Sequence, residues 1–438
     1  LLVFTATSDF LIARALAATV RPAGRKAWVA LSLVINLGML AYFKYTNFLL
    51  QTLLAIGQSM GSWFGVAPVG GTVYEPLDIF LPVGISFFTF QSLSYTIDVY
   101  RGELQPLRRW IDYLFYVSFF PGLVAGPIVR ARDFIPQMFR TPVVTRETLG
   151  EGLYLIICGL LKKSVISDYI SVNFVDRIFD APTLYTGLEN LVGAYGYALQ
   201  IYCDFSGYSD MAIGIALLLG IRFNTNFDSP YQSATITEFW RRWHISLSTW
   251  LKDYLYISLG GNRRGRVRTY VNLMLTMLLG GLWHGASGRF ILWGGLHGAA
   301  LAVHKFMMNH FPSFRPTGDT MSPLRRVCGV LITFHVVCFG WIFFRADTMA
   351  TGWDVIRQIF TAFHPEVFSQ FVVGYTEVFL LILGGYAIHF MPRVVDTTVR
   401  GWVTQSPTLV QALYLTVAII IVLQLKSADI VPFIYFQF

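Results

Sequence analysis

Long apolar runs separated by short polar segments make up most of this chain. A helix needs around 20 apolar residues to cross a lipid core of about 30 Å. The runs that we predict as helices are residues 27–43, 79–97, 111–128, 152–161, 188–200, 211–221, 270–283, 290–303, 327–344, 372–391 and 410–425. The pattern therefore predicts an all-α, polytopic membrane protein with roughly 10–12 hydrophobic segments.

Several of these segments are too short or too interrupted to be straight spans. Pro82, Pro121 and Pro127 fall inside them or at their ends. Non-helical backbone is tolerated at membrane depth only where protein or a water-filled cavity covers it. We therefore expect short or re-entrant helices among the full spans.

The main polar interruption lies between Ile221 and Tyr270. Thr237 and Glu238 are suited to begin a helix, because a hydroxyl caps free backbone N–H groups and a carboxylate complements the helix dipole. Residues 239–256 mix apolar and basic side chains, which is typical of an amphipathic helix at the membrane surface. A second polar stretch, residues 310–323, contains three prolines and is predicted to be an exposed connection.

Composition agrees with a membrane protein. Of the 438 residues, 55% are hydrophobic and only 13% are charged, whereas soluble domains carry about 25% charged residues. We treat residues 1–438 as a single integral membrane domain. Because the chain begins at Leu1, within an apolar pattern, we expect its N-terminus to be incomplete. No cleaved signal peptide is indicated.

The net charge of +8 does not indicate nucleic acid binding. The basic residues cluster at 21–26, 101–109, 130–146 and 241–268, while residues 45–100 and 178–221 contain no Lys or Arg. Cytoplasmic loops of membrane proteins are enriched in these residues. We therefore expect the four clusters to face the cytoplasm, with the lipid bilayer as the surrounding partner.

No metal or disulfide framework is expected. The four cysteines lie within apolar segments, without a C-x-x-C pair, and are read as small buried hydrophobic residues; they are Cys158, Cys203, Cys328 and Cys338. The histidines lack the i, i+4 spacing of a metal-binding helix.

Three histidines stand beside tryptophans or glycines in this apolar context: His244, His284 and His297. A neutral imidazole can take a proton from a hydroxyl group, so His284 and His244 are candidate catalytic residues. All three histidines also have a structural alternative. His284 and His297 could simply pack between helices, and His244 could lie at the membrane interface. The remaining histidines have no informative neighbours.

Polar side chains also interrupt the apolar pattern at residues 204–210, the segment DFSGYSD. Buried groups of this kind must be hydrogen-bonded or hydrated. They are candidates to line a polar tunnel or to orient a catalytic histidine, and the alternative is a helix-breaking network that fixes packing. The candidate tunnel residues are Asp204, Ser206, Tyr208, Asp210, Trp283 and His297.

The basic segment 241–268 is a candidate donor site. Its arginines could bind the phosphates of an acyl donor such as coenzyme A, or they could anchor the chain to anionic lipid. The candidate donor-binding residues are Arg241, Arg242, Trp243 and Arg263.

Several motifs resemble one known family. The stretch TEFWRRWHISLS at residues 237–248 resembles the signature of the membrane-bound O-acyltransferases and, within them, the bacterial alginate O-acetyltransferase branch, AlgI. Supporting matches are LPVGISFF at 81–88, AGP at 125–127, DFSGYSD at 204–210, LGGNR at 259–263 and GGLWHGA at 280–286. The resemblance extends to about Arg345.

The resemblance implies a helical membrane protein of the bacterial inner membrane with a central funnel or tunnel. The family's invariant histidine falls on His284 and its second histidine on His244. It also implies a cytoplasmic acyl thioester donor such as acetyl-CoA, no bound cofactor, a periplasmic acetyltransferase partner protein and an exported polysaccharide acceptor.

Two other functions remain open at this point. The chain could be a transporter or channel whose polar path uses Asp204 and Asp210, although no inverted repeat supports that reading. It could also be a non-catalytic acyl conduit. If it is an enzyme, we expect His284 to act on the acceptor hydroxyl or on a covalent relay. We expect His244 to position the donor thioester, with Arg241 or Arg242 at its phosphates.

Overall fold

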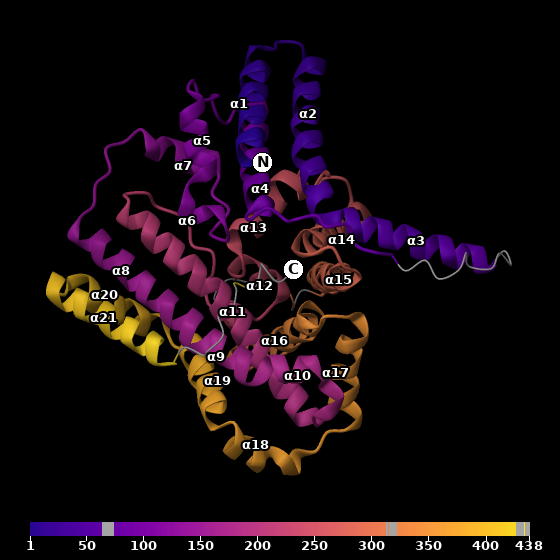
Figure 1. Cartoon of the computed structure of the whole chain (residues 1–438), viewed down its shortest axis with the longest axis vertical. Coiled ribbons are helices and arrows are strands. Elements are labelled where there is room, and N and C mark those ends of the chain that lie inside the picture. The colour runs from indigo at the N-terminus through magenta and orange to yellow at the C-terminus, as the bar shows by residue number, and fades with distance from the viewer. Residues whose placement is uncertain (64–73, 312–313, 315–321, 426–432, 434–438) are drawn as a thin grey trace. The chain divides into compact units, whose positions relative to one another are not determined.

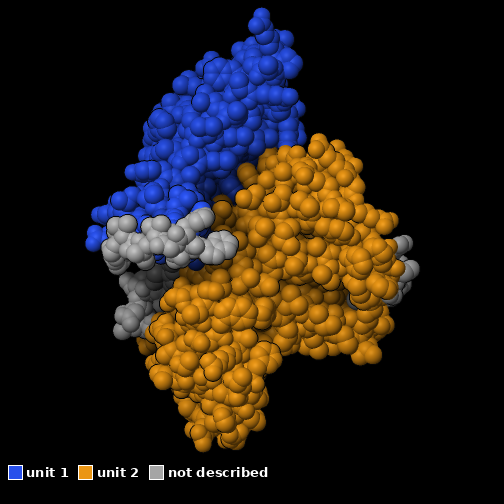
Figure 2. Space-filling view, turned by 90° about the vertical axis from the view of Figure 1, so that its right-hand side faces the viewer, with its two compact units in different colours: residues 1–124, 130–136, 285–287 blue, residues 125–129, 137–284, 288–438 orange. Residues whose placement is uncertain are grey.

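The computed structural model describes residues 1–63, 74–311, 314, 322–425 and 433 (Figure 1). These residues form helices and contain no β-strand, so the all-α prediction is confirmed. The chain divides into two compact units, coloured separately in Figure 2. Unit 1 comprises residues 1–124, 130–136 and 285–287, and unit 2 comprises residues 125–129, 137–284 and 288–438.

Unit 1 is a small helical bundle. Its helices are α1 (Leu2–Ala18), α2 (Pro22–Leu40), α3 (Thr46–Trp63), α4 (Ile85–Arg101), α5 (Trp110–Ser118), α6 (Phe120–Leu123) and most of α7 (Ala131–Met138), with the π-helix η1 (Ala41–Tyr45) between α2 and α3. Asp9 of α1 is buried and accepts hydrogen bonds from Ser32 (2.5 Å) and Asn36 (2.7 Å) of α2. Such polar contacts tie helices together in apolar surroundings.

Unit 2 contains the remaining helices. They are α8 (Arg146–Leu160), η2 (Leu161–Ser167), α9 (Asp168–Ile170), η3 (Ser171–Val175), α10 (Asp176–Asp180), η4 (Pro182–Leu184), α11 (Gly187–Leu218), η5 (Pro230–Gln232), α12 (Ile236–Arg242), α13 (Ile245–Trp250), η6 (Leu251–Tyr256), α14 (Arg266–His284), α15 (Gly288–His310), α16 (Pro323–Arg345), α17 (Met349–Thr361), η8 (Pro365–Val367), α18 (Phe368–Gly374), α19 (Thr376–His389), α20 (Arg393–Gln405) and α21 (Thr408–Leu425). Helices α20 and α21 both pack on α8 (Figure 1).

Helix α11 corrects one prediction. The runs 188–200 and 211–221 were expected as separate segments, but they belong to one helix of 32 residues. It begins with a capping box in which Thr186 and Glu189 hydrogen-bond each other's backbone N–H groups. The polar segment 204–210 stays helical, because its carboxylates find lysine partners on a neighbouring element without leaving the helical backbone.

Helices α8 and α11 approach closely through facing glycines. A Cβ atom at Gly159 would lie 2.5 Å from the carbonyl oxygen of Gly207, and one at Gly214 would lie 2.6 Å from that of Gly152. Small residues allow this kind of backbone contact between membrane helices. Helices α14 and α15 also approach closely through glycines, because a Cβ at Gly281 or Gly294 would collide with the backbone of the other helix.

The segment predicted as one amphipathic helix over residues 239–256 is also different. It consists of α12, α13 and the π-helix η6, with a break at Trp243 and His244. The helix cap is Thr235, whose hydroxyl accepts from the N–H of Glu238, and not Thr237. The helix breaks here because the backbone of His244 is left-handed, with φ +43°, and a right-handed helix cannot pass through such a residue.

Length and composition mark three helical segments among the described residues as able to cross a membrane: Pro22–Met60, Pro323–Arg345 and Thr408–Leu425. A fourth candidate is a pair bent by 99°, Pro365–Gly374 with Thr376–His389. This bend supports the prediction of broken or re-entrant helices. Most of the predicted proline-rich connection, residues 310–323, lies outside the described residues.

Candidate active site

His244 occupies the break between α12 and α13. Its side chain is fully buried, and it lies between two helices, not within the single helix that was expected. Left-handed backbone costs a non-glycine residue on the order of 1–3 kcal/mol and is concentrated at functional sites. Within the described residues, only Ser229 shares this backbone conformation among non-glycine residues.

Asn226 is the main polar partner of His244. Its Oδ1 lies 3.1 Å from Nδ1 of His244 and also accepts from the backbone N–H (3.2 Å) and the hydroxyl (2.9 Å) of Ser246. Its Nδ2 donates to the hydroxyl of Ser209 on α11 (3.1 Å). The Ser246 hydroxyl in turn accepts from the N–H of Ile128, at the end of the AGP motif (3.0 Å).

The other ring nitrogen of His244, Nε2, is buried and has no hydrogen-bond partner within the described residues. Burial lowers the pKa of this imidazole to about 3. His244 lies outside the candidate membrane spans, and the ring is therefore neutral at physiological pH. A neutral imidazole retains one nitrogen lone pair for accepting a proton.

His284 is the last residue of α14 and is only 4% exposed. Aromatic rings pack around it, among them those of Trp283, Trp293 and Phe344, with ring centroids 5.0, 5.1 and 5.2 Å away. The Trp283 ring also lies 6.2 Å from that of His244. The structure thus places both candidate catalytic histidines against one tryptophan.

His297 continues this cluster on α15. It is 1% exposed, and its ring lies 4.7 Å from that of Trp293 and 5.2 Å from that of Trp240. Neither of its ring nitrogens has a hydrogen-bond partner within the described residues. The close glycine contacts between α14 and α15 explain why residues 13 positions apart in the sequence share one aromatic cluster.

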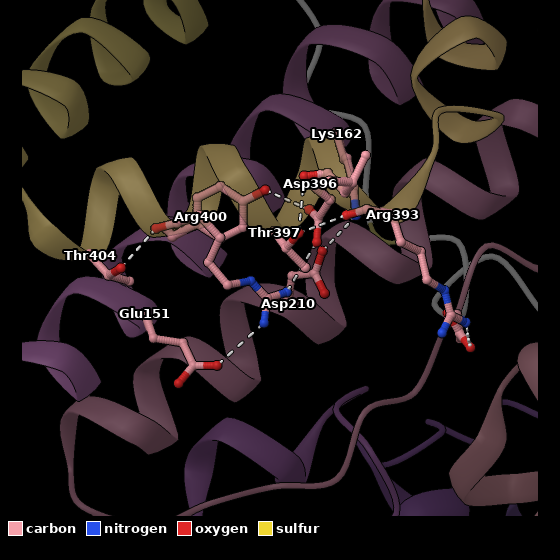
Figure 3. Close-up of polar contacts among 11 residues, drawn as sticks. Glu151, Lys162, Asp210, Arg393, Asp396, Thr397, Arg400 and Thr404 are labelled. Atoms are coloured by element: carbon pink, nitrogen blue, oxygen red, sulfur yellow. Dashed lines mark hydrogen bonds and ion pairs between the residues drawn. The ribbon is translucent and has the colours of Figure 1, made fainter.

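The carboxylates of the DFSGYSD segment are paired. Asp204 binds Lys163 (2.5 Å), and Asp210 binds Lys162 (2.7 Å, Figure 3); both lysines belong to η2. Ser206 is buried, and the ring of Tyr208 lies 4.8 Å from that of Phe433. All four of these predicted tunnel residues lie on α11, and its two carboxylates are neutralised by neighbouring lysines.

The predicted donor-binding residues lie in different environments. Arg241 and Arg263 are exposed. Arg242 binds Glu238 (2.9 Å) and lies near Asp228 (3.8 Å). Trp243 is 2% exposed and packs against aromatic rings, including that of Trp341 at 4.9 Å. Only the two exposed arginines are open to a ligand in this structure.

Sequence reasoning missed several residues of the site. Asn226 lay in the polar stretch 224–231, where nothing distinguished it from a loop residue. Lys162 and Lys163 lay just beyond a predicted apolar run ending at 161, and two adjacent lysines in such a setting were a usable signal for a buried carboxylate partner. Within the described residues, no group of three or more His, Cys, Asp and Glu side chains could hold a metal ion.

The sequence matches known proteins over most of its length. A model of the MBOAT, membrane-bound O-acyltransferase family, matches residues 108–353. A probable alginate O-acetylase AlgI of Azotobacter vinelandii is 45% identical over 79% of this chain and 65% of its own length. One from Pseudomonas putida is 38% identical over 96% of this chain and 86% of its own length.

A peptidoglycan O-acetyltransferase of Helicobacter pylori is also similar, at 35% identity over 93% of this chain and 76% of its own length. The chain spans less than two thirds of the Azotobacter relative, and 62% of the corresponding protein from Pseudomonas aeruginosa. The family model covers more than half of the chain and includes all three clustered histidines. The chain therefore belongs to the membrane-bound O-acyltransferase family.

Proposed function

We propose that this chain is a membrane O-acyltransferase that moves acetyl groups from a cytoplasmic thioester, such as acetyl-CoA, to a hydroxyl acceptor on the far side of the bacterial inner membrane. The observation that carries this proposal is the burial of His284 and His244 against the shared ring of Trp283. The names of the relatives, which include alginate O-acetylases and a peptidoglycan O-acetyltransferase, support an exported polysaccharide as the final acceptor.

The reaction requires a base in a site that excludes water. The hydroxyl oxygen of the acceptor attacks the thioester carbonyl carbon, a C–O bond forms and the C–S bond breaks. The hydroxyl proton passes to an imidazole nitrogen and then to the departing thiolate, so the histidine is unchanged at the end. We assign His284 as this base. The aromatic rings around it exclude the water that would otherwise hydrolyse the thioester.

Donor binding is assigned to the exposed arginines. Arg241 and Arg263 can contact the phosphates of a nucleotide-bearing thioester without giving up an internal ion pair, whereas Arg242 would have to leave Glu238. A periplasmic acetyltransferase partner would receive the acyl group and complete the transfer to the polysaccharide.

A transporter is less well supported. An ion or proton path through residues 204–210 would need carboxylates that can bind the transported ion or proton and release it again. Asp204 and Asp210 are instead held in ion pairs by Lys163 and Lys162, at 2.5 and 2.7 Å.

The test is His284→Ala in membranes carrying the full chain. Because loss of a general base typically costs 100-fold to 10,000-fold in rate, we expect acetyl transfer from acetyl-CoA to fall by at least about 100-fold, with insertion and thermal stability nearly unchanged. His310→Ala, an exposed histidine at the end of α15, is the matched control. Normal transfer by folded His284→Ala protein would refute the catalytic assignment and favour a conduit.

A further inference from the structure

The hydrogen-bond network around Asn226 fixes which nitrogen of His244 carries the proton. The backbone N–H of Ser246 can only donate, and it points at one terminal atom of the Asn226 amide at 3.2 Å. That atom must be the carbonyl oxygen, Oδ1. In this orientation the amide nitrogen of Asn226, Nδ2, donates to the hydroxyl of Ser209.

The position of Oδ1 also decides which nitrogen of the imidazole is protonated. Oδ1 of Asn226 is an acceptor only, and Nδ1 of His244 lies 3.1 Å from it. Nδ1 must therefore carry the hydrogen, so a neutral ring has its lone pair on Nε2. The hydroxyl of Ser246 is consistent with this assignment, because it accepts from the N–H of Ile128 and donates to Oδ1 of Asn226.

Asn226 is placed to hold this arrangement rigidly. Both Asn226 and His244 are fully buried, so no bulk water competes for their hydrogen bonds. The backbone carbonyl of Asn226 also accepts from the N–H of Ile245 (2.9 Å), the first residue of α13. The same residue thereby holds both the ring and the backbone next to the left-handed turn.

We infer that Asn226 is a positioning residue that locks His244 in the Nδ1–H tautomer and presents Nε2 as a hydrogen-bond acceptor for an N–H or O–H group of a bound substrate. This inference rests on the proposed acyl transfer for its substrate, but the tautomer itself follows from the network alone. It changes the role expected for His244. An unprotonated Nε2 cannot donate to a thioester carbonyl, so this histidine does not polarise the carbonyl of the donor.

The tautomer can be measured directly. In protein labelled with ¹⁵N-histidine and reconstituted in lipid vesicles, the two ring nitrogens of His244 give separate signals that report which one is protonated. The His244→Gln variant identifies those signals by their loss. We expect Nδ1–H in the unmodified protein. An Nε2–H ring, or a mixture of both tautomers, would overturn the inference whether or not the protein transfers acetyl groups.

Variants then test Asn226 itself. Asn226→Leu removes the acceptor and should release the ring to a mixture of tautomers, with acetyl-CoA turnover reduced on the order of 100-fold. Asn226→Asp keeps an acceptor oxygen and should retain the Nδ1–H signal. Asn190→Leu removes a buried asparagine of α11 that donates to the backbone carbonyl of Pro182, before the helix begins, and should leave His244 unchanged.

The outcomes separate the two proposals. An unchanged tautomer in folded Asn226→Leu protein would refute the role of Asn226. If that variant does not fold, loss of the Nδ1–H signal in Asn226→Asp, which preserves the acceptor, would refute it instead. A fixed Nδ1–H tautomer in a protein without any acetyl transfer would leave the positioning intact and contradict the proposed function.

Discussion

At the scale of single residues, the two adjacent arginines at 241 and 242 have different tasks. Arg242 forms an ion pair with Glu238 across one turn of α12 and donates to the backbone carbonyl of Asp228 (3.2 Å). Arg241 is exposed on the same helix. One arginine therefore stabilises the fold around the histidine, while its neighbour is exposed, as the proposed donor site requires.

This difference gives a paired prediction. Arg241→Gln should weaken acetyl-CoA binding several-fold without changing the melting temperature, because only a solvent-exposed charge is lost. Arg242→Gln should lower the melting temperature by a few degrees, because hydrogen bonds to charged groups contribute about 1.5–3 kcal/mol. Calorimetric titration and thermal unfolding in detergent measure the two effects. Equal loss of donor affinity in both variants would contradict the division.

At the scale of elements, the contact between η2 and α11 depends on buried charge as well as on glycines. Lys162 and Asp210 are about one quarter exposed or less, with side-chain exposures of 27% and 18%. Further along α8, Arg400 of α20 reaches Glu151 at 3.4 Å (Figure 3). Ion pairs thus fix two neighbouring helices against α8 and its π-helical extension.

A double-mutant cycle tests the first pair. Lys162→Met should destabilise the protein by about 3 kcal/mol, discounted for partial exposure, because it leaves a carboxylate without its cation. Lys162→Met combined with Asp210→Leu should recover most of this loss, since no uncompensated charge remains. Chemical unfolding in detergent measures both. A double variant no more stable than the single variant would contradict this expectation.

Apolar periodicity predicted the elements well where packing is purely hydrophobic. The segments 27–43, 270–283 and 290–303 correspond to α2 with η1, α14 and α15. It failed at α11, because a polar segment within an apolar run looks the same whether it breaks the helix or finds charged partners elsewhere. The lysines that decide the outcome are 41 and 48 residues away from their carboxylate partners in the sequence.

The candidate site was predictable in its chemistry but not in its arrangement. Local residue types identified His284 and His244, which lie 40 positions apart. No local sequence pattern predicts that both contact the same tryptophan, because this contact depends on how the chain turns between α12, α13 and α14. Asn226 was not predictable for the same reason, since its importance comes from three donors that converge on it in space.

At the scale of the whole molecule, the orientation of the chain in the membrane decides where the donor enters. The arginines at 263, 264, 266 and 268 are all exposed in the turn before α14 and in its first residues. Positively charged loops are retained in the cytoplasm. The exposed basic segment therefore predicts that acetyl-CoA reaches the site from the cytoplasmic side.

Cysteine labelling can check this orientation. Asn262 is exposed and tolerates substitution better than Gly265, whose φ of +88° strains other residues. An impermeant thiol reagent should label Asn262→Cys only after the inner membrane is permeabilised, with the natural cysteines replaced to remove background. Labelling in intact spheroplasts would reverse the topology, and the donor side with it.

The left-handed backbone at His244 sets a limit on how this family member could be stabilised. Glycine adopts this conformation freely, so replacing the histidine by glycine removes a backbone cost on the order of 1–3 kcal/mol together with the buried imidazole. The same replacement leaves a cavity where the ring packed and takes a hydrogen-bond partner from Asn226. The relaxed backbone and the lost packing oppose each other, so glycine, the usual remedy for a left-handed residue, is not expected to give a more stable protein at this position.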